Sequence, residues 1–205
     1  MFCRHGGGIV LQRVASSRRF GRIAVSCLLC LGFWQFGQGA YIPAKAWVAQ
    51  EMMQRAWQKA EGGNDAPPPW PWADTRPVAK LSARGGDIEL IILEGGSGRT
   101  LAFGPGHLSI SVLPGEEGNS IIAGHRDTHF QFLQYLQRGE SIQVELANGR
   151  RHLYEVSDID VVDSRRGSII LDTDSPMLSL VTCYPFNAIE VGGPMRYVVT
   201  AKMIF

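Results

Sequence analysis

Short β-forming runs separated by turn residues fill the sequence after residue 76 and constrain the fold more than any other feature. The runs are rich in Val, Ile, Leu and Tyr, and Gly, Pro, Asn and Asp stand between them. Asn148-Gly149, between two such runs, is a strong signal for a tight β-hairpin. Many short strands with tight turns indicate an all-β sandwich or barrel, because a parallel α/β sheet needs long helices between its strands. Eight strands are predicted, at residues 78–83, 88–93, 108–112, 119–123, 141–146, 151–162, 177–183 and 195–205.

Two further segments precede this β-rich region. Residues 44–60 carry apolar side chains at helical spacing, which predicts a helical stalk. Prolines 67–69 and the tryptophans beside them predict a stiff, extended linker that reaches residue 75. A peptide ligand for another domain is the alternative interpretation of this Trp-Pro segment. Within the β-rich region, one short helix is predicted over residues 128–137, where Phe, Leu and Leu recur on one face.

The charge of the chain is unevenly distributed. Its net charge is +1, but five of its 20 Lys and Arg residues lie among the first 22 residues, which include no acidic residue. The other 15 basic residues stand against 19 acidic ones. A domain that binds nucleic acid carries a basic patch, so the folded part of this chain is not expected to have a nucleic-acid partner.

An uncharged, mostly apolar segment follows the basic N-terminus and predicts a transmembrane helix over residues 23–43. Its length of about 20 residues is what a helix needs to cross a bilayer. By the positive-inside rule, residues 1–22 stay in the cytoplasm and the domain of residues 76–205 lies outside. A cleaved signal peptide is the alternative, because the strongly apolar stretch is only about 12 residues long. We therefore expect a single-pass protein of the inner (plasma) membrane with a periplasmic or otherwise extracytoplasmic domain.

Cysteine usage singles out Cys183. It is the only cysteine after residue 30, so it has no disulfide partner within the β-rich region. Cys27 and Cys30 form a Cys-x-x-Cys inside the apolar segment, where packing or lipid attachment is expected and a redox pair is the alternative. An exported domain works in a compartment that oxidises thiols, so a single cysteine kept there indicates reactivity.

Three residues at strand ends predict a thiol acyl-transfer site. Cys183 ends one apolar run, His125 follows another, and Arg196 lies near the start of the last predicted strand. A thiolate attacks carbonyl carbons, and an imidazolium can pair with it and then protonate the departing amine. A guanidinium can stabilise the oxyanion of the tetrahedral intermediate. If the strands that carry Cys183 and Arg196 are antiparallel neighbours, these two residues lie side by side.

Each of these residues also has an ordinary interpretation when it is considered alone. A cysteine at a strand end is often buried filler, and an arginine on an edge strand is often a solvated charge. His107, His125 and His129 could also be metal ligands. Their spacing of 18 and 4 residues fits no compact zinc pattern. Neither a metal nor another cofactor is therefore expected.

The combination of motifs resembles the sortases, a family of membrane-anchored cysteine transpeptidases, over roughly residues 70–205. The family's cysteine motif, Thr-Leu-x-Thr-Cys, corresponds to residues 179–183, with serine in place of the first threonine. The histidine element corresponds to residues 118–128, and the arginine strand begins at Arg196. The N-terminal segment of residues 37–47 is similar to the proteobacterial branch of the family.

This resemblance implies an all-β fold, an eight-stranded sortase-type β-barrel with short helices, preceded by the N-terminal transmembrane helix. It implies that Cys183 is the nucleophile, His125 the proton donor and Arg196 the group that holds the oxyanion or the peptide. The substrate would be a Leu-Pro-x-Thr-Gly-like sorting signal at the C-terminus of an exported protein. Cleavage would form a thioacyl-enzyme, which an amine acceptor then resolves.

The resemblance also suggests substrate-binding residues. The family builds much of its peptide groove just before the cysteine strand, here residues 157–176. Arg165 and Arg166 in this segment are predicted to contact substrate, with a solvated loop as the alternative, and Thr182 beside the nucleophile is assigned the same role.

Three functions are consistent with these residues. A transpeptidase transfers the acyl group to an added amine, whereas a cysteine hydrolase on the same scaffold releases the free acid. A non-catalytic binding module would keep its function after replacement of Cys183. The sequence does not identify the amine acceptor, the variable position of the sorting signal or the number of client proteins. It also does not give calcium dependence, cleavage of the N-terminal segment or the oligomeric state.

Overall fold

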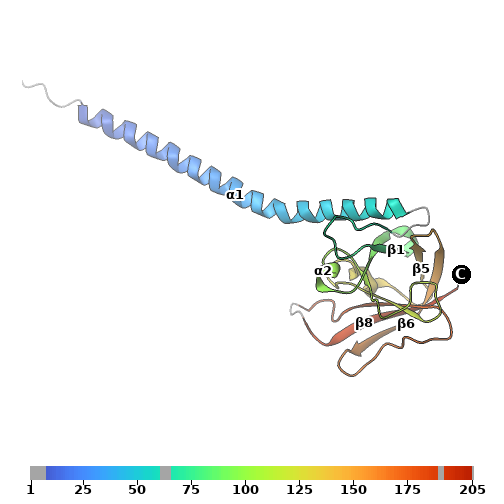
Figure 1. The fold of residues 1–205 in the computed structure, drawn as a ribbon. Helices are drawn as coiled ribbons and strands as arrows, with labels where there is room; N and C mark the ends of the chain where they lie inside the picture. Colours follow the sequence, from blue (N-terminus) through green and yellow to red (C-terminus); the bar gives the residue numbers. More distant parts are fainter. Residues whose placement is uncertain (1–7, 61–65, 189–191, 205) are drawn as a thin grey trace, which may run out of the picture. The chain divides into compact units, whose positions relative to one another are not determined.

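The computed structural model describes residues 8–60, 66–188 and 192–204, without the side chains of residues 8–24 and 36–44 (Figure 1). By its internal contacts the chain divides into two units, Met1–Val48 and Ala49–Phe205. One long helix, α1 (Gly8–Ala60), contributes to both units. The β-rich part of the sequence lies within the second unit.

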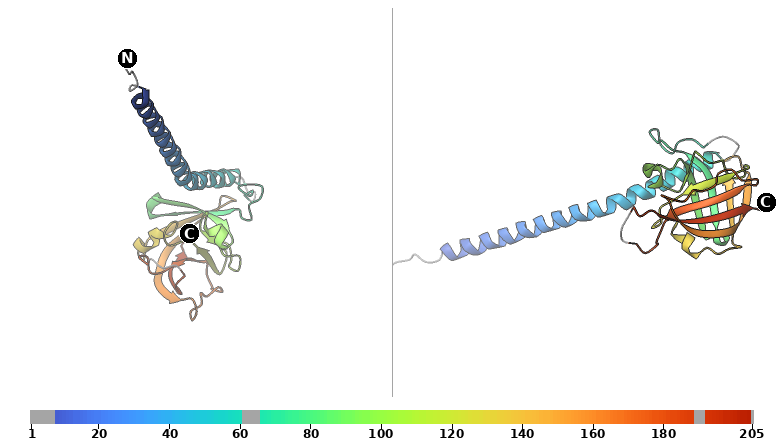
Figure 2. Two further views of the ribbon diagram at one scale, coloured as in Figure 1. Left: turned by 90° about the vertical axis from the view of Figure 1, so that its left-hand side faces the viewer. Right: turned by 90° about the horizontal axis from the view of Figure 1, so that it is seen from below.

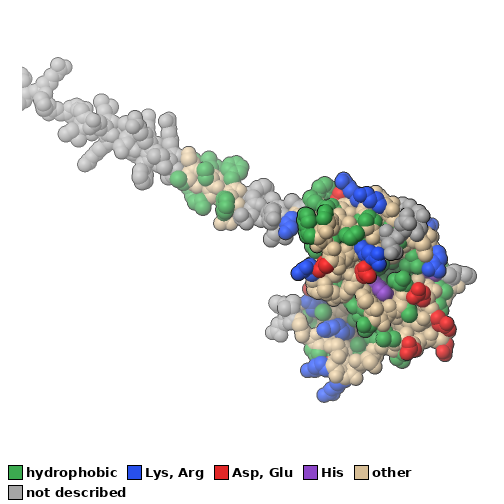
Figure 3. Space-filling model, viewed as in Figure 1, with side chains coloured by type: hydrophobic (Ala, Val, Ile, Leu, Met, Phe, Trp, Pro, Cys, Tyr) green, Lys and Arg blue, Asp and Glu red, His purple; other side chains and the backbone are tan. Residues whose placement is uncertain are grey.

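The first unit consists of the N-terminal part of α1. Its described side chains between residues 25 and 34 are largely apolar and exposed (green on α1 in Figure 3), and include Val25, Leu28, Leu29, Leu31, Phe33 and Trp34. No helix within the described part of the chain is both long enough and apolar enough to cross a membrane. The side chains of residues 1–24 and 36–43 lie outside the described part. The transmembrane helix over residues 23–43 and the cytoplasmic placement of residues 1–22 therefore stay predictions.

The last part of α1 belongs to the second unit and packs within it. From Ala49 onward the helix buries one face, including the side chains of Met53 and Trp57. The Gln50 side chain donates a hydrogen bond of 2.7 Å from Nε2 to the Phe103 carbonyl. Apolar residues at three- and four-residue spacing give the helix this buried face. The segment expected to be a stalk thus ends as part of the folded unit.

The second unit is built around a closed barrel of eight strands, which confirms the predicted fold class (Figure 2). The strands follow one another around the barrel in the order β1-β2-β3-β4-β7-β8-β6-β5. Closure pairs every strand on both sides, so the barrel has no free edge. The strands are β1 (Pro77–Ala83), β2 (Ile88–Glu94), β3 (Gly106–His107), β4 (Asn119–Ala123), β5 (Ser141–Leu146), β6 (Arg151–Asp163), β7 (Met177–Cys183) and β8 (Met195–Met203).

The interior of the barrel is filled by alternate residues of the strands. In β1, for example, every second residue is buried, as expected where one face of a strand points to the core. Tyr154 of β6 is fully buried, and its hydroxyl accepts a hydrogen bond of 2.7 Å from the Gly115 backbone N–H. Burial raises the pKa of this tyrosine to about 12. The other large, fully buried side chains of the barrel include Leu81, Ile92, Ile122, Phe130, Leu133, Ile142, Leu178 and Leu180.

Two predicted elements were wrong in detail. The third strand is Gly106–His107 rather than residues 108–112, because Gly106 leaves room for the close approach of Gly95, whose carbonyl oxygen would lie 2.0 Å from an added Cβ. The helix predicted over residues 128–137 is a shorter 3₁₀ helix, η2 (Gln131–Tyr135), flanked by bonds between residues three apart. Two short helices, η1 (Arg84–Gly86) and α2 (Gly98–Leu101), were not predicted.

Candidate active site

Three adjacent strands bring the predicted catalytic residues to one end of the barrel. β4 and β7 are parallel neighbours, with Ala123 opposite Val181. β7 and β8 are antiparallel neighbours, as expected, and Cys183 lies directly opposite Arg196. His125 follows the end of β4 by two residues. The topology thus places all three residues at the same end of the barrel.

The loop that carries His125 is held by bonds to β7 and by a glycine. The Gly124 N–H donates a 3.0 Å hydrogen bond to the Val181 carbonyl, and the Thr182 hydroxyl donates one of 2.7 Å to the Gly124 carbonyl. A Cβ at Gly124 would lie 2.8 Å from the ring of the buried Phe130, so a glycine is needed there. The Phe130 N–H in turn donates to the His125 carbonyl at 3.0 Å. His125 itself is exposed at the end of this fixed loop.

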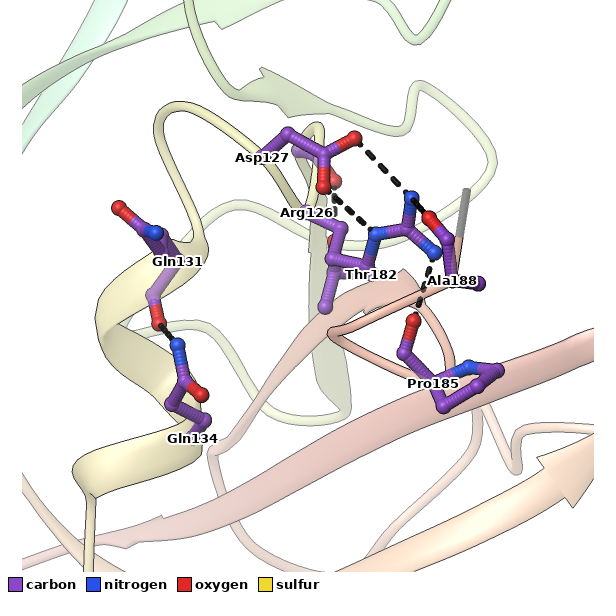
Figure 4. A network of polar contacts seen from close by, with 8 residues as sticks. Arg126, Asp127, Gln131, Gln134, Thr182, Pro185 and Ala188 are labelled. Atoms are coloured by element: carbon purple, nitrogen blue, oxygen red, sulfur yellow. Dashed lines mark hydrogen bonds and ion pairs between the residues drawn. The ribbon is translucent and has the colours of Figure 1, made fainter. Parts of the chain in front are cut away.

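Arg126 connects the loop after β4 with the loop after β7 (Figure 4). Its side chain is only 6% exposed. Nε and Nη2 donate to the two carboxylate oxygens of Asp127, at 2.8 and 3.1 Å. Nη1 donates to the Pro185 carbonyl at 2.6 Å, and Nη2 also donates to the Ala188 carbonyl at 2.9 Å. One guanidinium therefore joins the segments that follow His125 and Cys183.

A cavity of about 520 Å³ lies between these two loops. Cys183 and His125 both line it, so the thiol and the imidazole share one space. Cys183 is half-buried. The remaining lining residues are Arg126, Asp127, Tyr184, Pro185, Ala188, Gly192 and Gly193.

Arg196 faces Cys183 across the strand pair but does not line this cavity. Its Nη1 donates to the carbonyls of Gly193 and Met195, at 2.6 and 2.9 Å. Within the described residues these bonds use only Nη1, so the N–H groups on Nε and Nη2 can serve another acceptor. The guanidinium is thus held by the backbone of its own loop, on the residue that pairs with Cys183 in the strand register.

The predicted substrate-binding residues lie apart from the cavity. Thr182 is buried, and its hydroxyl is engaged with Gly124, which favours a positioning role over contact with substrate. Arg165 lies in the loop after β6 and binds both carboxylate oxygens of Asp163, at 3.1 and 2.9 Å. Arg166 is exposed in the same loop. None of the three lines the cavity that Cys183 and His125 share.

Charged neighbours shift the pKa values of several groups around His125. The hydrogen bond from Arg126 lowers the pKa of Asp127, and the nearby His125 lowers it further. The same hydrogen bond raises the pKa of Arg126. Burial lowers the pKa of His129, and the charge of His125 adds to this effect. Arg126 and Asp127 are therefore both ionised at neutral pH.

The histidines considered as metal ligands have other surroundings. His107 is buried, and its Nε2 lies 2.8 Å from the Val112 carbonyl oxygen, a hydrogen-bonded contact. His129 lies in a separate depression beside η2. Among the described residues, no cluster of three or more His, Cys, Asp or Glu side chains is arranged to hold a metal ion.

The sequence predicted Cys183, His125 and Arg196 at neighbouring strand ends but assigned no role to Arg126. The available signal was the pair Arg126-Asp127 directly after the histidine. Such a pair is equally typical of a solvated loop. What distinguishes Arg126 is its binding to the carbonyls of Pro185 and Ala188, which no side-chain pattern in the sequence marks.

Comparisons with known proteins agree with this architecture. The family model described as Sortase domain matches residues 81–204. Sortase D of Bacillus subtilis (strain 168) is 36% identical over 119 residues, which cover 58% of this chain and 59% of that relative. The chain thus spans less than two thirds of the length of this relative.

Solved structures show the same fold. The Clostridium perfringens sortase D5 transpeptidase superimposes with a TM-score of 0.61 at 23% identity, covering 77% of this chain and 99% of that chain. The catalytic domain of SrtD from B. anthracis superimposes with a TM-score of 0.53 at 29% identity, covering 63% and 88%. Because the sortase domain accounts for more than half of its residues, the chain belongs to the sortase family.

Proposed function

We propose that this protein is a cysteine transpeptidase that cleaves a C-terminal sorting signal and transfers the new acyl end to an amine. One observation carries the proposal. Cys183 and His125 line a single cavity at the ends of adjacent strands, and Arg196 stands opposite Cys183 in the strand register. Acyl transfer requires a nucleophile, a proton carrier and a hydrogen-bond donor for the oxyanion, and these three groups lie at one end of the barrel.

In the first half of the reaction, the Cys183 thiolate attacks the carbonyl carbon of Thr in the signal. A carbon–sulfur bond forms, and the carbonyl oxygen becomes an oxyanion. Arg196 stabilises it through N–H groups that are not used by Gly193 and Met195. The His125 imidazolium then gives its proton to the departing amine nitrogen as the carbon–nitrogen bond breaks.

In the second half, the neutral His125 accepts a proton from the incoming amine. The amine nitrogen attacks the thioester carbon, a new amide bond forms, and Cys183 leaves as a thiolate. His125 is again an imidazolium, so the enzyme returns to its starting state. Transfer depends on the amine reaching the thioester before water does.

Family membership and the sequence pattern support a proposed substrate class and location. A Leu-Pro-x-Thr-Gly-like signal on an exported protein is the proposed donor. The basic N-terminus and the exposed apolar side chains of α1 support a membrane-bound protein whose catalytic unit works outside the cytoplasm. Thr182 is proposed to fix the His125 loop against β7, because its hydroxyl binds Gly124.

Mass spectrometry of the full-length protein tests the function. The protein is incubated with a Leu-Pro-x-Thr-Gly-type peptide, with and without triglycine. We expect an adduct on Cys183 that retains the peptide through Thr and is converted to a triglycine conjugate. Cys183→Ala is the matched control and should give neither species.

Each other outcome points to a different conclusion. Free acid alone at high triglycine concentration would identify a hydrolase. No adduct with a panel of such peptides would contradict the proposed substrate class. Conjugate formation by Cys183→Ala would remove the thiol from the mechanism.

A further inference from the structure

The buried guanidinium of Arg126 holds the turn that follows Cys183. Residues 185–188 form this turn, which is closed by a 3.2 Å hydrogen bond from the Ala188 N–H to the Pro185 carbonyl. Arg126 donates to the carbonyls of both end residues of the turn, at 2.6 and 2.9 Å. These partners are 59 and 62 residues away in the sequence. The contact therefore ties two separate loops together.

The neighbouring carboxylate fixes the orientation of this guanidinium. Both oxygens of Asp127 accept hydrogen bonds from Arg126, so the planar group is held from one side and offers its other N–H groups to the turn. Asp127 is 64% exposed, whereas Arg126 is 6% exposed. A lysine in place of Arg126 has one compact ammonium and cannot reach the carboxylate and both carbonyls in this geometry.

The turn held by Arg126 is part of the cavity wall. Pro185 and Ala188 line the cavity together with Cys183 and His125. Arg126 itself lines it, between the two loops. The position of one wall relative to the thiol therefore depends on two hydrogen bonds from a single side chain, which two more bonds to Asp127 orient.

We propose that Arg126 is a positioning residue that keeps residues 185–188 in place while the thioacyl-enzyme exists, so that an amine rather than water resolves it. This inference rests on the proposed transpeptidase function. Water is present at far higher concentration than any amine, so selective transfer needs a shaped site that aligns the amine and limits solvent. Loss of the guanidinium frees the turn and widens access to the thioester.

The ratio of amine conjugate to free acid measures this role. Arg126→Gln is expected to lower the ratio at fixed triglycine by at least about fivefold, because the amine is no longer aligned. The ratio does not depend on the fraction of enzyme that is folded, since both products come from the same thioacyl-enzyme. Arg126→Lys should give an intermediate ratio. The rate of thioacyl formation should change less than the ratio.

Arg99→Gln is the matched control. Arg99 forms an ion pair of 3.0 Å with Asp74, and both side chains are largely exposed. The substitution removes the same charge from another arginine–aspartate pair. It should leave the ratio of the two products unchanged.

Amide hydrogen exchange of residues 186–188 provides a second readout that needs no substrate. In Arg126→Gln, exchange in this turn should be roughly tenfold faster, with the barrel strands unchanged. Wild-type exchange rates in the variant would overturn the inference, and so would an unchanged product ratio. Free acid as the only product of the wild-type protein would overturn the proposed function instead. Formation of the amine conjugate by the wild-type protein leaves that function intact, whatever the variant does.

Discussion

Arg126 and Arg165 each bind an aspartate that is close in sequence, but their surroundings differ. Arg126 is 6% exposed and also binds two carbonyls more than 50 residues away. Arg165 is 71% exposed, and its side chain bonds only to Asp163 within the described part of the chain. Both belong to loops at the same end of the barrel. The Ser164 N–H donates to the Pro194 carbonyl at 2.9 Å, and Pro194 directly precedes β8, whose start pairs with the end of β7.

The difference shows that burial and the range of contacts decide what an arginine does. An exposed ion pair contributes about 0–1 kcal/mol, because water competes for both charges. Arg126 differs because its guanidinium is buried and also binds carbonyls of a second loop, so its removal takes a donor away from those carbonyls. The loop after β4 is therefore a fixed part of the site, whereas the Arg165 side chain in the loop after β6 is held by local bonds to Asp163.

His125→Gln is expected to have the largest effect on catalysis in the fixed region. The thioacylation rate should fall by on the order of 10²–10⁴, because no other side chain replaces the proton carrier. Rapid-quench mass spectrometry of the adduct measures this rate. His129→Gln, four residues along the same loop, should change it less than about twofold, since His129 lies in a separate depression and does not line the cavity of Cys183. Equal losses in both variants would show that the loop, not the His125 side chain, is required.

Arg196→Lys comes next in size. The variant keeps the positive charge but loses the fork of N–H donors, so kcat should fall by on the order of 10²–10³. The bonds of Arg196 are as local as those of Arg165, and its proposed role depends instead on its position opposite Cys183. A loss of less than about threefold in kcat would assign the oxyanion to another donor, and Arg126 is the guanidinium that lines the cavity.

Gly124→Ala tests how firmly the fixed loop is packed. The new Cβ would lie 2.8 Å from the Phe130 ring, which is fully buried. Overpacking of this kind costs about 1–3 kcal/mol of unfolding free energy, measured by denaturant titration. Gly98→Ala is the control, because its Cβ meets no atom within 4 Å. Equal stability of the two variants would mean that the loop yields more easily than its contacts indicate.

Arg165→Gln and Arg166→Gln test the other loop. If its arginines are solvated, the KM for the peptide should change by less than about fivefold, the equivalent of an exposed ion pair. Steady-state assays over a range of peptide concentrations give this value. A rise of more than about tenfold would establish contact with substrate, as the resemblance to the family suggests, and would remove the contrast with Arg126.

The strands at the site could be predicted because their apolar runs end in clear turn signals. The bounds of β4, β5 and β7 agree with the predicted residues. β3 was misplaced because it forms through backbone bonds of a glycine and a histidine, including that of the Gly95 N–H to the His107 carbonyl at 2.9 Å. No hydrophobic alternation marks a two-residue strand.

Site residues could be predicted where the chemistry of the residue type marks them. They could not be predicted where only their contacts in the folded protein mark them. A lone cysteine and a histidine at strand ends are visible in the sequence. The inward-facing hydroxyl of Thr182 and the long-range bonds of Arg126 are not, because their acceptors are backbone carbonyls. Which carbonyls meet a side chain is decided by the parallel pairing of β4 with β7.

The smallest expected effect is on the pH dependence of stability. Burial, with a contribution from His125, holds the pKa of His129 below its usual value of 6.5 in the folded state. Below pH 6.5 the unfolded chain binds a proton that the folded protein does not, so the free energy of unfolding falls as the pH falls. The slope from this group is at most about 1.4 kcal/mol per pH unit, and the full stability is present above pH 6.5.

His129→Gln should flatten this acid-side slope and leave stability above pH 7 nearly unchanged. Urea titrations at several pH values between 5 and 8 measure it. His152 has its pKa lowered by burial and by Arg150, so His152→Gln should act in the same direction, and the two effects should add because the residues lie in different elements. A slope that stays the same in His129→Gln would show that this part of the fixed loop opens enough to admit a proton. In that case the packing that fixes the loop after β4, and makes it differ from the loop after β6, ends before residue 129.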